Sequence, residues 1–290
     1  MGDMAISAVL PTRQRAAALR HTFPRIRALH GVDEIIVVPD GPEDPAVDLL
    51  RDEPDPRVRV EPTTPGAGSP AARNRGAHLS SGTWVLFLED DCGFPPDYAT
   101  VLRAEAEQHR ADIVGAPMVR PRRGESLSEA AAQARSVQRD RRTLDEIAGF
   151  TAGPTFTPFL PAPSLVARRV FDQLAFDEGF RENAYREETD FFVRAWRAGF
   201  RCLLTPETFF WSAGRWPGGN HRGPVHDEWW RLRNNRRFLR RHGEWLRAQQ
   251  LIASPALEGA LFVGRRVRLL ATGRVQRSPR RGIGEPWTNP

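Results

Sequence analysis

The sequence has no lysine, only two cysteines and no long hydrophobic run, and each absence excludes a kind of protein. Every one of the 42 basic residues is an arginine, and against 36 acidic residues they give a formal net charge of +6. Because the preference for arginine extends along the whole chain, the positive charge alone does not indicate binding to nucleic acid. No segment approaches the ~20 apolar residues that a membrane-spanning helix needs.

The two cysteines, Cys92 and Cys202, lack the spacing of a disulfide framework or of a structural zinc site. A reducing compartment fits this pattern. The N-terminal stretch MGDMAISAVLPTRQR has an apolar run too short for a secretory signal peptide, and it begins with an acid instead of a basic region. We therefore expect the protein to be cytoplasmic.

Short apolar runs alternate with stretches of helical spacing in the first half of the chain. The apolar runs lie at 5–11, 34–40, 57–62, 84–90 and 112–119, and helical spacing covers 13–31 and 69–82. Alternation of this kind predicts an α/β protein with a parallel sheet covered by helices. In such a sheet, ligands bind in the crevice beyond the carboxyl ends of the strands.

The second half of the chain is less regular. A proline-rich loop at 152–164 precedes a predicted helix at 186–199, which Gly199 would end, and a strand at 200–206. A Gly/Trp-rich loop then leads to an Arg/Trp-rich helix at 225–243. The residues after about 250 are rich in arginine and end in a Gly/Pro-rich stretch, for which we expect disorder.

The buried-strand pattern at 84–88 ends in three consecutive carboxylates, Glu89, Asp90 and Asp91. Side chains alternate along an extended chain, so Glu89 and Asp91 would point together while Asp90 points away. Two carboxylates so placed suit a hard divalent cation. Without a cation, at least one of the three should hold a proton. A solvated acidic turn is the alternative, but the position after a buried strand favours the cation.

A second acidic cluster, "REETD", opens the predicted helix at 186–199 with Glu187, Glu188 and Asp190. Acids in a first turn complement the helix dipole, and Asp190 can pair with Arg194 four residues later. This structural role accounts for the cluster by itself. A carboxylate at a helix start can also act as a general base if it faces a cleft.

Taken in order, "VLPTRQR", "IIVVPDG", "GSPAARNRGAHLSSGTWVLFLEDD" and "FDEGFRENAYREETDFFVRAWRAGF" resemble the successive motifs of the family 2 glycosyltransferases, over roughly residues 5–240. The resemblance implies the GT-A fold, which is Rossmann-like with a mostly parallel central sheet flanked by helices. We expect a catalytic domain at 1–245, with a nucleotide-sugar-binding half at 1–120 and an acceptor-binding half at 121–245. A basic, helical and partly disordered extension would follow at 246–290.

The resemblance also implies roles for individual residues. "EDD" stands where the family has its Asp-x-Asp metal motif, with Glu89 in place of the first Asp, so Glu89 and Asp91 would bind Mn²⁺ or Mg²⁺. The family often has a histidine as third metal ligand; Trp211 stands at the expected position, and His221 in the nearby Gly-rich loop is the candidate. The residues expected at the nucleotide-sugar are Pro11, Thr12, Arg13, Asp40, Arg73, Asn74 and Asp90.

In "REETD", Glu188 stands at the position of the family's catalytic base, which is usually an Asp. An extra methylene moves the carboxylate by ~1 Å, so Asp190 stays open as the alternative base. The implied reaction is an inverting, metal-dependent transfer of a sugar from a nucleoside-diphosphate sugar, with a UDP-sugar expected, to a hydroxyl. The acceptor would be a polysaccharide, a lipid-linked molecule or a natural product.

Two other functions share some of these features. A nucleotidyltransferase would have a Gly-rich phosphate loop after the first strand, where this sequence reads PTRQRAAAL. A nucleic-acid-binding protein could use the interleaved Arg and Trp at 229–246, but no known nucleic-acid-binding signature is present, and we expect no such partner. The Trp/Arg-rich helix and the basic, partly apolar stretch at 260–275 have two other uses open to them. They could hold an anionic or lipid-linked acceptor, or contact an acidic membrane surface, at the inner face of the membrane for a cytoplasmic protein.

Overall fold

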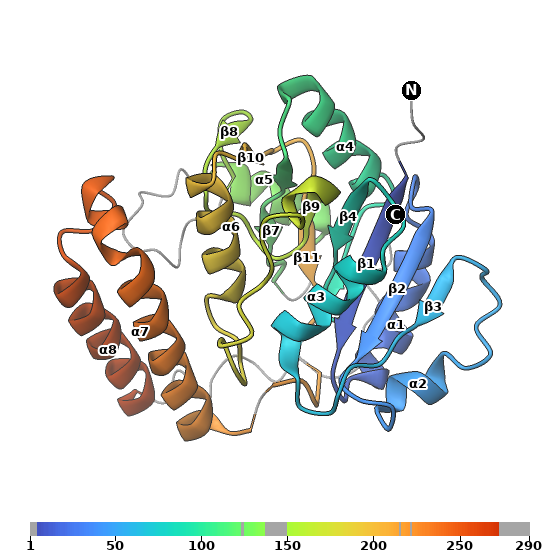
Figure 1. Ribbon diagram of the computed structural model, residues 1–290, viewed down its shortest axis with the longest axis horizontal. Helices are drawn as coiled ribbons and strands as arrows, with labels where there is room; N and C mark the ends of the chain where they lie inside the picture. The colour runs from blue at the N-terminus through green and yellow to red at the C-terminus, as the bar shows by residue number, and fades with distance from the viewer. Residues whose placement is uncertain (1–4, 123–124, 137–149, 215, 221, 273–290) are drawn as a thin grey trace.

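The computed structural model describes residues 5–122, 125–136, 150–214, 216–220 and 222–272 (Figure 1). A central sheet carries helices on both faces, and a hairpin of two long helices, α7 and α8, stands at one side of it (Figure 1). This architecture confirms the predicted α/β class. No helix in these segments is long and apolar enough to cross a membrane.

The central sheet has eight strands in the order β3-β2-β1-β4-β9-β6-β10-β8. Its strands are β1 (Ile6–Thr12), β2 (Glu34–Pro39), β3 (Val58–Val60), β4 (Trp84–Phe87), β6 (Ile113–Gly115), β8 (Thr155–Phe156), β9 (Ser164–Ala167) and β10 (Cys202–Leu204). The strands β3, β2, β1 and β4 pair in parallel, while β9 runs antiparallel to both β4 and β6. The sheet is therefore mostly parallel, as the alternation of apolar and helical segments predicts.

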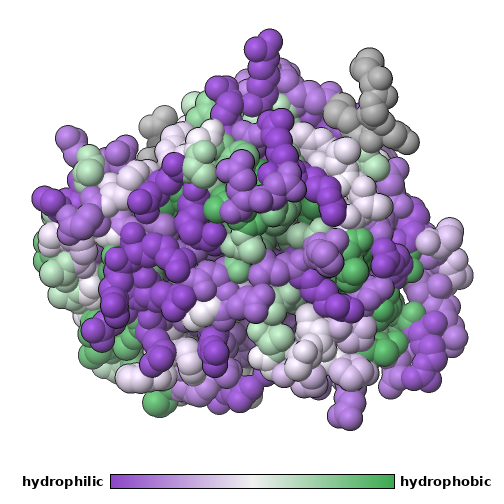
Figure 2. Space-filling view, viewed as in Figure 1, coloured by the Kyte–Doolittle hydropathy of each residue, from purple (hydrophilic) through white to green (hydrophobic). Residues whose placement is uncertain are grey.

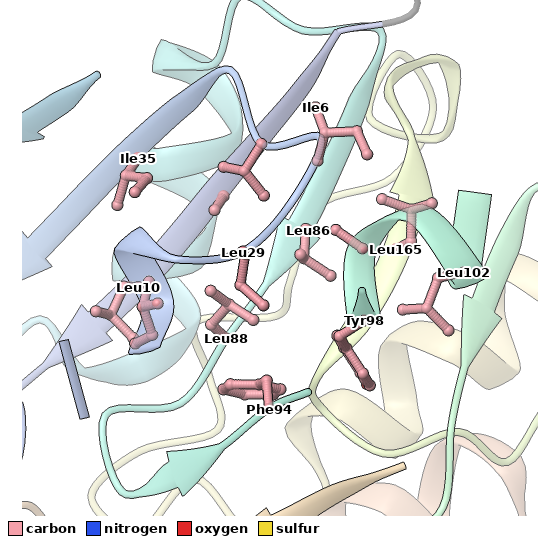
Figure 3. Close-up of a cluster of buried hydrophobic side chains, with 14 of the residues drawn as sticks. Ile6, Leu10, Leu29, Ile35, Leu86, Leu88, Phe94, Tyr98, Leu102 and Leu165 are labelled. Atoms are coloured by element: carbon pink, nitrogen blue, oxygen red, sulfur yellow. The ribbon is translucent and has the colours of Figure 1, made fainter. Parts of the chain in front are cut away.

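Both faces of the central sheet are buried. Alternate residues of β1 enter different cores, with Leu10 on one face and Val9 on the other. Figure 3 shows the first core, where Ile6, Leu86 and Leu165 come from three neighbouring strands. Burial on both faces explains why the strands appear as continuous apolar runs in the sequence.

The helices cover the sheet in two layers. Helices α1 and α4 pack on the first core, and α3 and α6 pack on the second. The bounds of the eight helices in the described segments are α1 (Ala16–Arg27), α2 (Pro45–Leu49), α3 (Gly68–Leu79), α4 (Tyr98–His109), α5 (Leu127–Ser136), α6 (Glu187–Arg197), α7 (Pro224–Ala248) and α8 (Pro255–Ala271). Gly199 follows α6 with φ of 94°, a conformation that favours glycine, as expected for the end of this helix.

The run at 112–119 was expected as one strand but forms two. It continues from β6 through Pro117 into β7 (Met118–Val119), which joins a separate three-stranded sheet with β5 (Cys92–Gly93) and β11 (Phe210–Ser212). Proline has no backbone N–H to donate to a neighbouring strand. The carbonyl of Pro117 instead accepts a hydrogen bond from the Phe210 N–H, which leads the chain into the second sheet.

Helix α7 is longer than predicted and has its own core contacts. Phe238 and Leu246 pack with Phe180 and Val193, which attaches the helix to α6. The helix runs past the expected domain boundary at residue 245, and the division of the chain at 120 and 245 stays a prediction. The C-terminal stretch expected to be disordered lies outside the described residues from 273 onward.

Helix α3 rests on β1 through Gly76, which gives a test of the packing. A Cβ at Gly76 would overlap the Val9 side chain, so Gly76→Ala should lower the free energy of unfolding by about 1–3 kcal/mol. Gly264 of α8 has no neighbour within 4 Å, so Gly264→Ala should raise it by up to about 1 kcal/mol through helix propensity. Urea unfolding of both variants measures the change in free energy. Equal changes at the two glycines would contradict the close packing of α3 on β1.

Candidate active site

A cavity of about 310 Å³ lies at the carboxyl ends of β1, β2 and β4, next to the N-terminal ends of α3 and α6. Its walls come from Asp40 and from residues of the segments 11–15, 68–73, 88–91, 183–188 and 219–220. This is the edge of the sheet where a ligand was expected. The predicted site residues that line it are Pro11, Thr12, Arg13, Asp40, Arg73, Glu89, Asp90, Asp91 and Glu188.

Arg15 binds two of the three consecutive carboxylates and offsets one of their charges. Its Nη1 atom donates hydrogen bonds to Asp90 Oδ1 and to Asp91 Oδ2, each at 2.8 Å. Thr12 Oγ1 donates to the other oxygen of Asp90, also at 2.8 Å. Burial alone would lower the pKa of Arg15, but the charges of Asp90 and Asp91 outweigh it and raise the pKa above its ordinary value. The chain therefore supplies one of the cations that this cluster requires.

Glu89 and Asp91 point into the same space, as predicted, but the chain there is a turn and not an extended strand, and the Cys92 N–H donates to the Glu89 carbonyl at 3.3 Å. Asp90, which was expected to point away, therefore lines the same cavity. One oxygen of Glu89 and one of Asp91, together with the sulfur of Cys92, form a group of atoms within 4.8 Å of one another. Arg73 Nη2 lies 3.6 Å from Glu89 Oε1 and is the nearest counter-charge to it. Burial raises the pKa of the Cys92 thiol well above its ordinary value, so the sulfur stays protonated.

The cavity contains more carboxylates than cations. Three guanidinium groups, those of Arg13, Arg15 and Arg73, face six carboxylates: Asp40, Glu89, Asp90, Asp91, Glu187 and Glu188. Burial, reinforced by the charge of Asp91, raises the pKa of Glu89 to about 7. Burial also raises the pKa of Asp90 to about 6, although Arg15 acts against it. An added cation would relieve this surplus of negative charge.

The donor atoms of the cluster fit a hard divalent cation. Carboxylate oxygens are the ligands that Mg²⁺ and Mn²⁺ prefer, and Glu89 and Asp91 supply them from one side of the cavity. The protonated Cys92 thiol is a poor ligand for either ion. His221, the expected third ligand, lies outside the described residues. The other nearby histidine, His226, lies within α7, and its Nδ1 is 3.6 Å from Asp227 Oδ1.

The ends of β1 and β2 form the next part of the wall. Arg13 pairs with Asp40 through Nε at 2.9 Å and donates from Nη1 to Asn220 Oδ1 at 3.0 Å. The Gly219 N–H also donates to the Arg13 carbonyl, which ties the Gly-rich loop to the turn after β1. Gly41, with φ of 110°, allows the turn that follows Asp40.

Asn74 does not line the cavity, although the resemblance placed it near the donor. Its amide oxygen accepts from the Phe176 N–H at 2.8 Å, and its Nδ2 donates to the Phe176 carbonyl at 3.0 Å. Asn74 therefore fastens the segment before α6 to α3. Its spacing from Arg73 explains the outcome, because adjacent residues on a helix point in different directions.

The start of α6 brings two glutamates to the cavity. The carboxylate of Glu187 is buried and accepts hydrogen bonds through Oε1 from Ser69 Oγ and from Arg73. Its other oxygen, Oε2, is buried without a hydrogen-bond partner in the described part of the chain. Glu188 lines the cavity beside it and is half-buried. Arg73 therefore contacts both acidic clusters, Glu89 from the first and Glu187 from the second.

Asp190 is fully buried and does not line the cavity. It accepts hydrogen bonds from Arg194 Nε at 2.7 Å, from Arg241 Nη1 at 2.8 Å and from His242 Nε2 at 2.9 Å. Burial acts to raise the pKa of Asp190, but the hydrogen bond from His242 and the two arginines outweigh it and lower the pKa below its ordinary value. Asp190 thus joins α6 to α7.

Sequence reasoning missed Arg15, Ser69 and Glu187 as parts of this site. Arg15 stands two residues after Arg13, in the segment that was expected at the nucleotide-sugar, but the sequence does not show that its partners are Asp90 and Asp91. Glu187 was read as an acid that complements the helix dipole. Nothing in the sequence marks Ser69, which enters the site through its contact with Glu187.

The raised pKa of Glu89 predicts how stability depends on pH when no divalent cation is present. The unfolded chain loses this proton near pH 4.5 and the folded chain near pH 7, so the folded state holds more protons in between. Stability should fall as the pH rises through this window. Glu89→Gln should therefore be more stable than the wild type at pH 8, with a smaller difference at pH 5.

Urea unfolding in the presence of a chelator, at both pH values, measures this difference. The exposed Glu107 of α4 offers the control, because Glu107→Gln should give the same small change at both pH values. An equal stability difference between Glu89→Gln and the wild type at pH 5 and pH 8 would contradict the raised pKa of Glu89.

The sequence matches the model of one protein family, described as Glycosyl transferase family 2, over residues 7–173. This match covers more than half of the chain and includes β1, β4 and the three carboxylates after β4. No curated protein matches the sequence.

Several solved structures share the architecture. The crystal structure of S. aureus TarS 1–349 in complex with UDP-GlcNAc superposes with a TM-score of 0.60 at 14% identity, covering 80% of this chain and 65% of that chain. Another structure of S. aureus TarS 1–349 has a TM-score of 0.54 at 16% identity, covering 72% of this chain and 60% of that chain. GalNAc-T7 with UDP, GalNAc and Mn²⁺ gives 0.57 at 15% identity, covering 75% of this chain and 45% of that chain.

The chain thus spans about 60% of the length of TarS 1–349, and at such low identities the likeness concerns the fold. The family match carries the identity, and it confirms the resemblance that the order of the motifs indicates. This chain belongs to glycosyl transferase family 2, and its α/β architecture is the GT-A fold of a glycosyltransferase.

Proposed function

We propose that this protein is a metal-dependent, inverting glycosyltransferase that moves a sugar from a nucleoside-diphosphate sugar to an acceptor hydroxyl. One observation carries the proposal. The cavity brings Glu89 and Asp91, from the end of β4, together with Glu188, from the start of α6. A cation-binding edge and a free carboxylate facing one space are what such a transfer requires.

The donor end of the cavity would be the one formed by β1 and β2. Thr12, Arg13 and Asp40 lie there and offer a hydroxyl, a guanidinium and a carboxylate to a nucleoside. Pro11 and Asp90 border the same end. A UDP-sugar is the proposed donor, which the complexes of the similar protein TarS with UDP and with UDP-GlcNAc support.

Asp91 and Glu89 would hold the divalent cation, Mn²⁺ or Mg²⁺. When bound, the ion would offset the negative charge that grows on the diphosphate as the sugar leaves. Arg15 would contribute to the same task, because its guanidinium already borders Asp90 and Asp91 and its Nε has no hydrogen-bond partner in the described part of the chain. Arg15 would donate a hydrogen bond to the diphosphate, and its own ion pair with Asp91 would weaken.

Glu188 would act as the general base. It would take the proton from the acceptor hydroxyl as that oxygen attacks the anomeric carbon, and a single displacement of this kind inverts the anomeric configuration. Asp190 is less suited to this role, because three donors already occupy its oxygens and it does not reach the cavity. Asp190 would instead hold the first turn of α6, and with it Glu188, in position.

The two candidate bases make opposite predictions. Glu188→Gln should lower kcat by about 10²–10⁴-fold and leave the KM for the donor nearly unchanged, because only the proton transfer is lost. Asp190→Asn should chiefly lower stability, by about 3–5 kcal/mol, because it leaves the charges of Arg194 and Arg241 without their shared partner.

Turnover of a panel of nucleoside-diphosphate sugars, measured as release of the nucleotide, tests the proposed function and the base together. Unfolding curves of both variants separate stability from chemistry. A protein that turns over none of the donors would contradict the function. A fully active Glu188→Gln beside a folded but inactive Asp190→Asn would contradict the base alone.

Arg15 has a prediction of its own. Arg15→Met should weaken binding of UDP by about 10–100-fold, since a charged hydrogen bond contributes about 1.5–3 kcal/mol. In the absence of nucleotide it should strengthen binding of Mn²⁺, because Asp91 loses its competing partner. Calorimetric titrations of each ligand measure both changes, with Arg51→Met in the exposed turn after α2 as control. A loss of affinity for both UDP and Mn²⁺ would contradict the proposed competition between Arg15 and Mn²⁺ for Asp91.

A further inference from the structure

The hairpin of α7 and α8 carries nearly all of the exposed large hydrophobic side chains. The described residues contain eight such side chains, and only Phe156 lies elsewhere. The seven on the hairpin are Val225 and Trp229 on α7, and Leu257, Leu261, Val263, Val267 and Leu270 on α8. Figure 2 shows hydrophobic side chains along the left edge of the molecule, where Figure 1 places this hairpin.

Helix α8 presents its apolar side to solvent and its polar side to the protein. Phe262 is its one buried residue and lies against Tyr185, with the ring centres 5.6 Å apart. Arg266 turns inward to pair with Glu228 of α7, and Arg265 pairs with Glu258 at 3.1 Å. The exposed residues of α8 are Ala256, Leu257, Ala260, Leu261, Val263, Gly264, Val267, Arg268, Leu270 and Ala271.

This arrangement reverses that of an ordinary surface helix, in which the apolar side faces the core. Arg268 is the one charged residue among the exposed residues of α8. An apolar helix face of this length would be covered by another surface in the working protein.

The same hairpin is strongly basic. Its two helices contain ten arginines and four acidic residues, so their formal net charge of +6 equals that of the whole chain. On α7, Trp229, Arg233, Arg236 and Arg240 recur every three or four residues and are exposed, so they share one side of the helix. The hairpin thus combines an exposed apolar side on α8 with a row of exposed arginines on α7.

A second copy of the chain fits this surface poorly. A helix of 17 residues is about 25 Å long, and one side of it offers only a few hundred Å², below the roughly 800 Å² per partner of a stable interface. A symmetric pair would also bring two strongly basic hairpins together. Both considerations disfavour a dimer.

An anionic lipid bilayer fits both properties. The apolar side of a helix that lies in the membrane plane enters the boundary between headgroups and acyl chains, and neighbouring arginines pair with lipid phosphates. We propose that the α7–α8 hairpin docks this protein on a membrane surface that contains anionic phospholipids, with the exposed side of α8 in contact with the lipid. This docking is independent of the proposed sugar transfer, since none of the hairpin residues named here lines the cavity.

Sedimentation of the full-length protein with vesicles tests the charge requirement. The protein should sediment at low salt with phosphatidylcholine vesicles that contain phosphatidylglycerol, but not with phosphatidylcholine alone. Exchanging Arg236 and Arg240 for Gln should lower the partition coefficient about fivefold for each arginine. The matched control exchanges Arg51, which is exposed in the turn after α2, and Arg103, which is partly exposed on α4, and it should leave binding unchanged. No binding to the anionic vesicles, or an equal loss in both pairs, would overturn the proposal.

An environment-sensitive fluorophore at α8 identifies what covers this surface. Both native cysteines are buried, so Val267→Cys gives one accessible position for acrylodan. The emission should shift to the blue when anionic vesicles are added, and the same label at Phe156→Cys should not respond. A shift that depends on protein concentration without vesicles would assign the surface to a second copy. Blue-shifted emission already present in dilute protein without vesicles would show that another part of the same chain covers the exposed side of α8. Either of these two results would overturn the proposal.

Discussion

The structure depends on how a surplus of buried negative charge is held at the end of β4. Three consecutive carboxylates follow that strand, and burial makes the ionised forms of Glu89 and Asp90 costly. Arg15 binds two of them directly, and Arg73 lies beside the third. Six carboxylates and three guanidinium groups still leave the cavity short of positive charge. A divalent cation would offset this surplus of negative charge, and the proposed function uses such a cation to hold the diphosphate of the donor.

Two ion-pair groups, one in the wall of the cavity and one outside it, hold the two acidic segments in place. Arg73 connects α3 to Glu89 after β4 and to Glu187 at the start of α6. Asp190 connects α6 to Arg241 and His242 of α7. Breaking a buried pair leaves an uncompensated charge, so these contacts hold the two acidic segments in one relative position. The helix that presents Glu188 is therefore held at both its cavity side and its outer side.

Much of the fold was predictable because buried parallel strands leave continuous apolar runs, and the end of β4 places its acids at the ligand-binding edge. The joint position of Glu89 and Asp91 was also predicted, although a turn, and not the alternation of an extended strand, produces it. Contacts between distant segments were not predictable in this way. Arg15 is one arginine among 42, and only the fold shows that it binds Asp90 and Asp91. Likewise, Asn74 turns toward Phe176 because of its direction on α3. The inverted arrangement of α8 could not be predicted either, since the spacing of its apolar residues fits a helix with either side facing the protein.

The central claim is that the cavity binds a nucleoside-diphosphate sugar through a divalent cation held by the carboxylates after β4. Calorimetric titration of UDP-GlcNAc into the protein, with Mn²⁺ and then with a chelator, tests it most directly. The account predicts binding with Mn²⁺ that disappears with the chelator and in Asp91→Asn. Binding of equal strength in the chelator would contradict it.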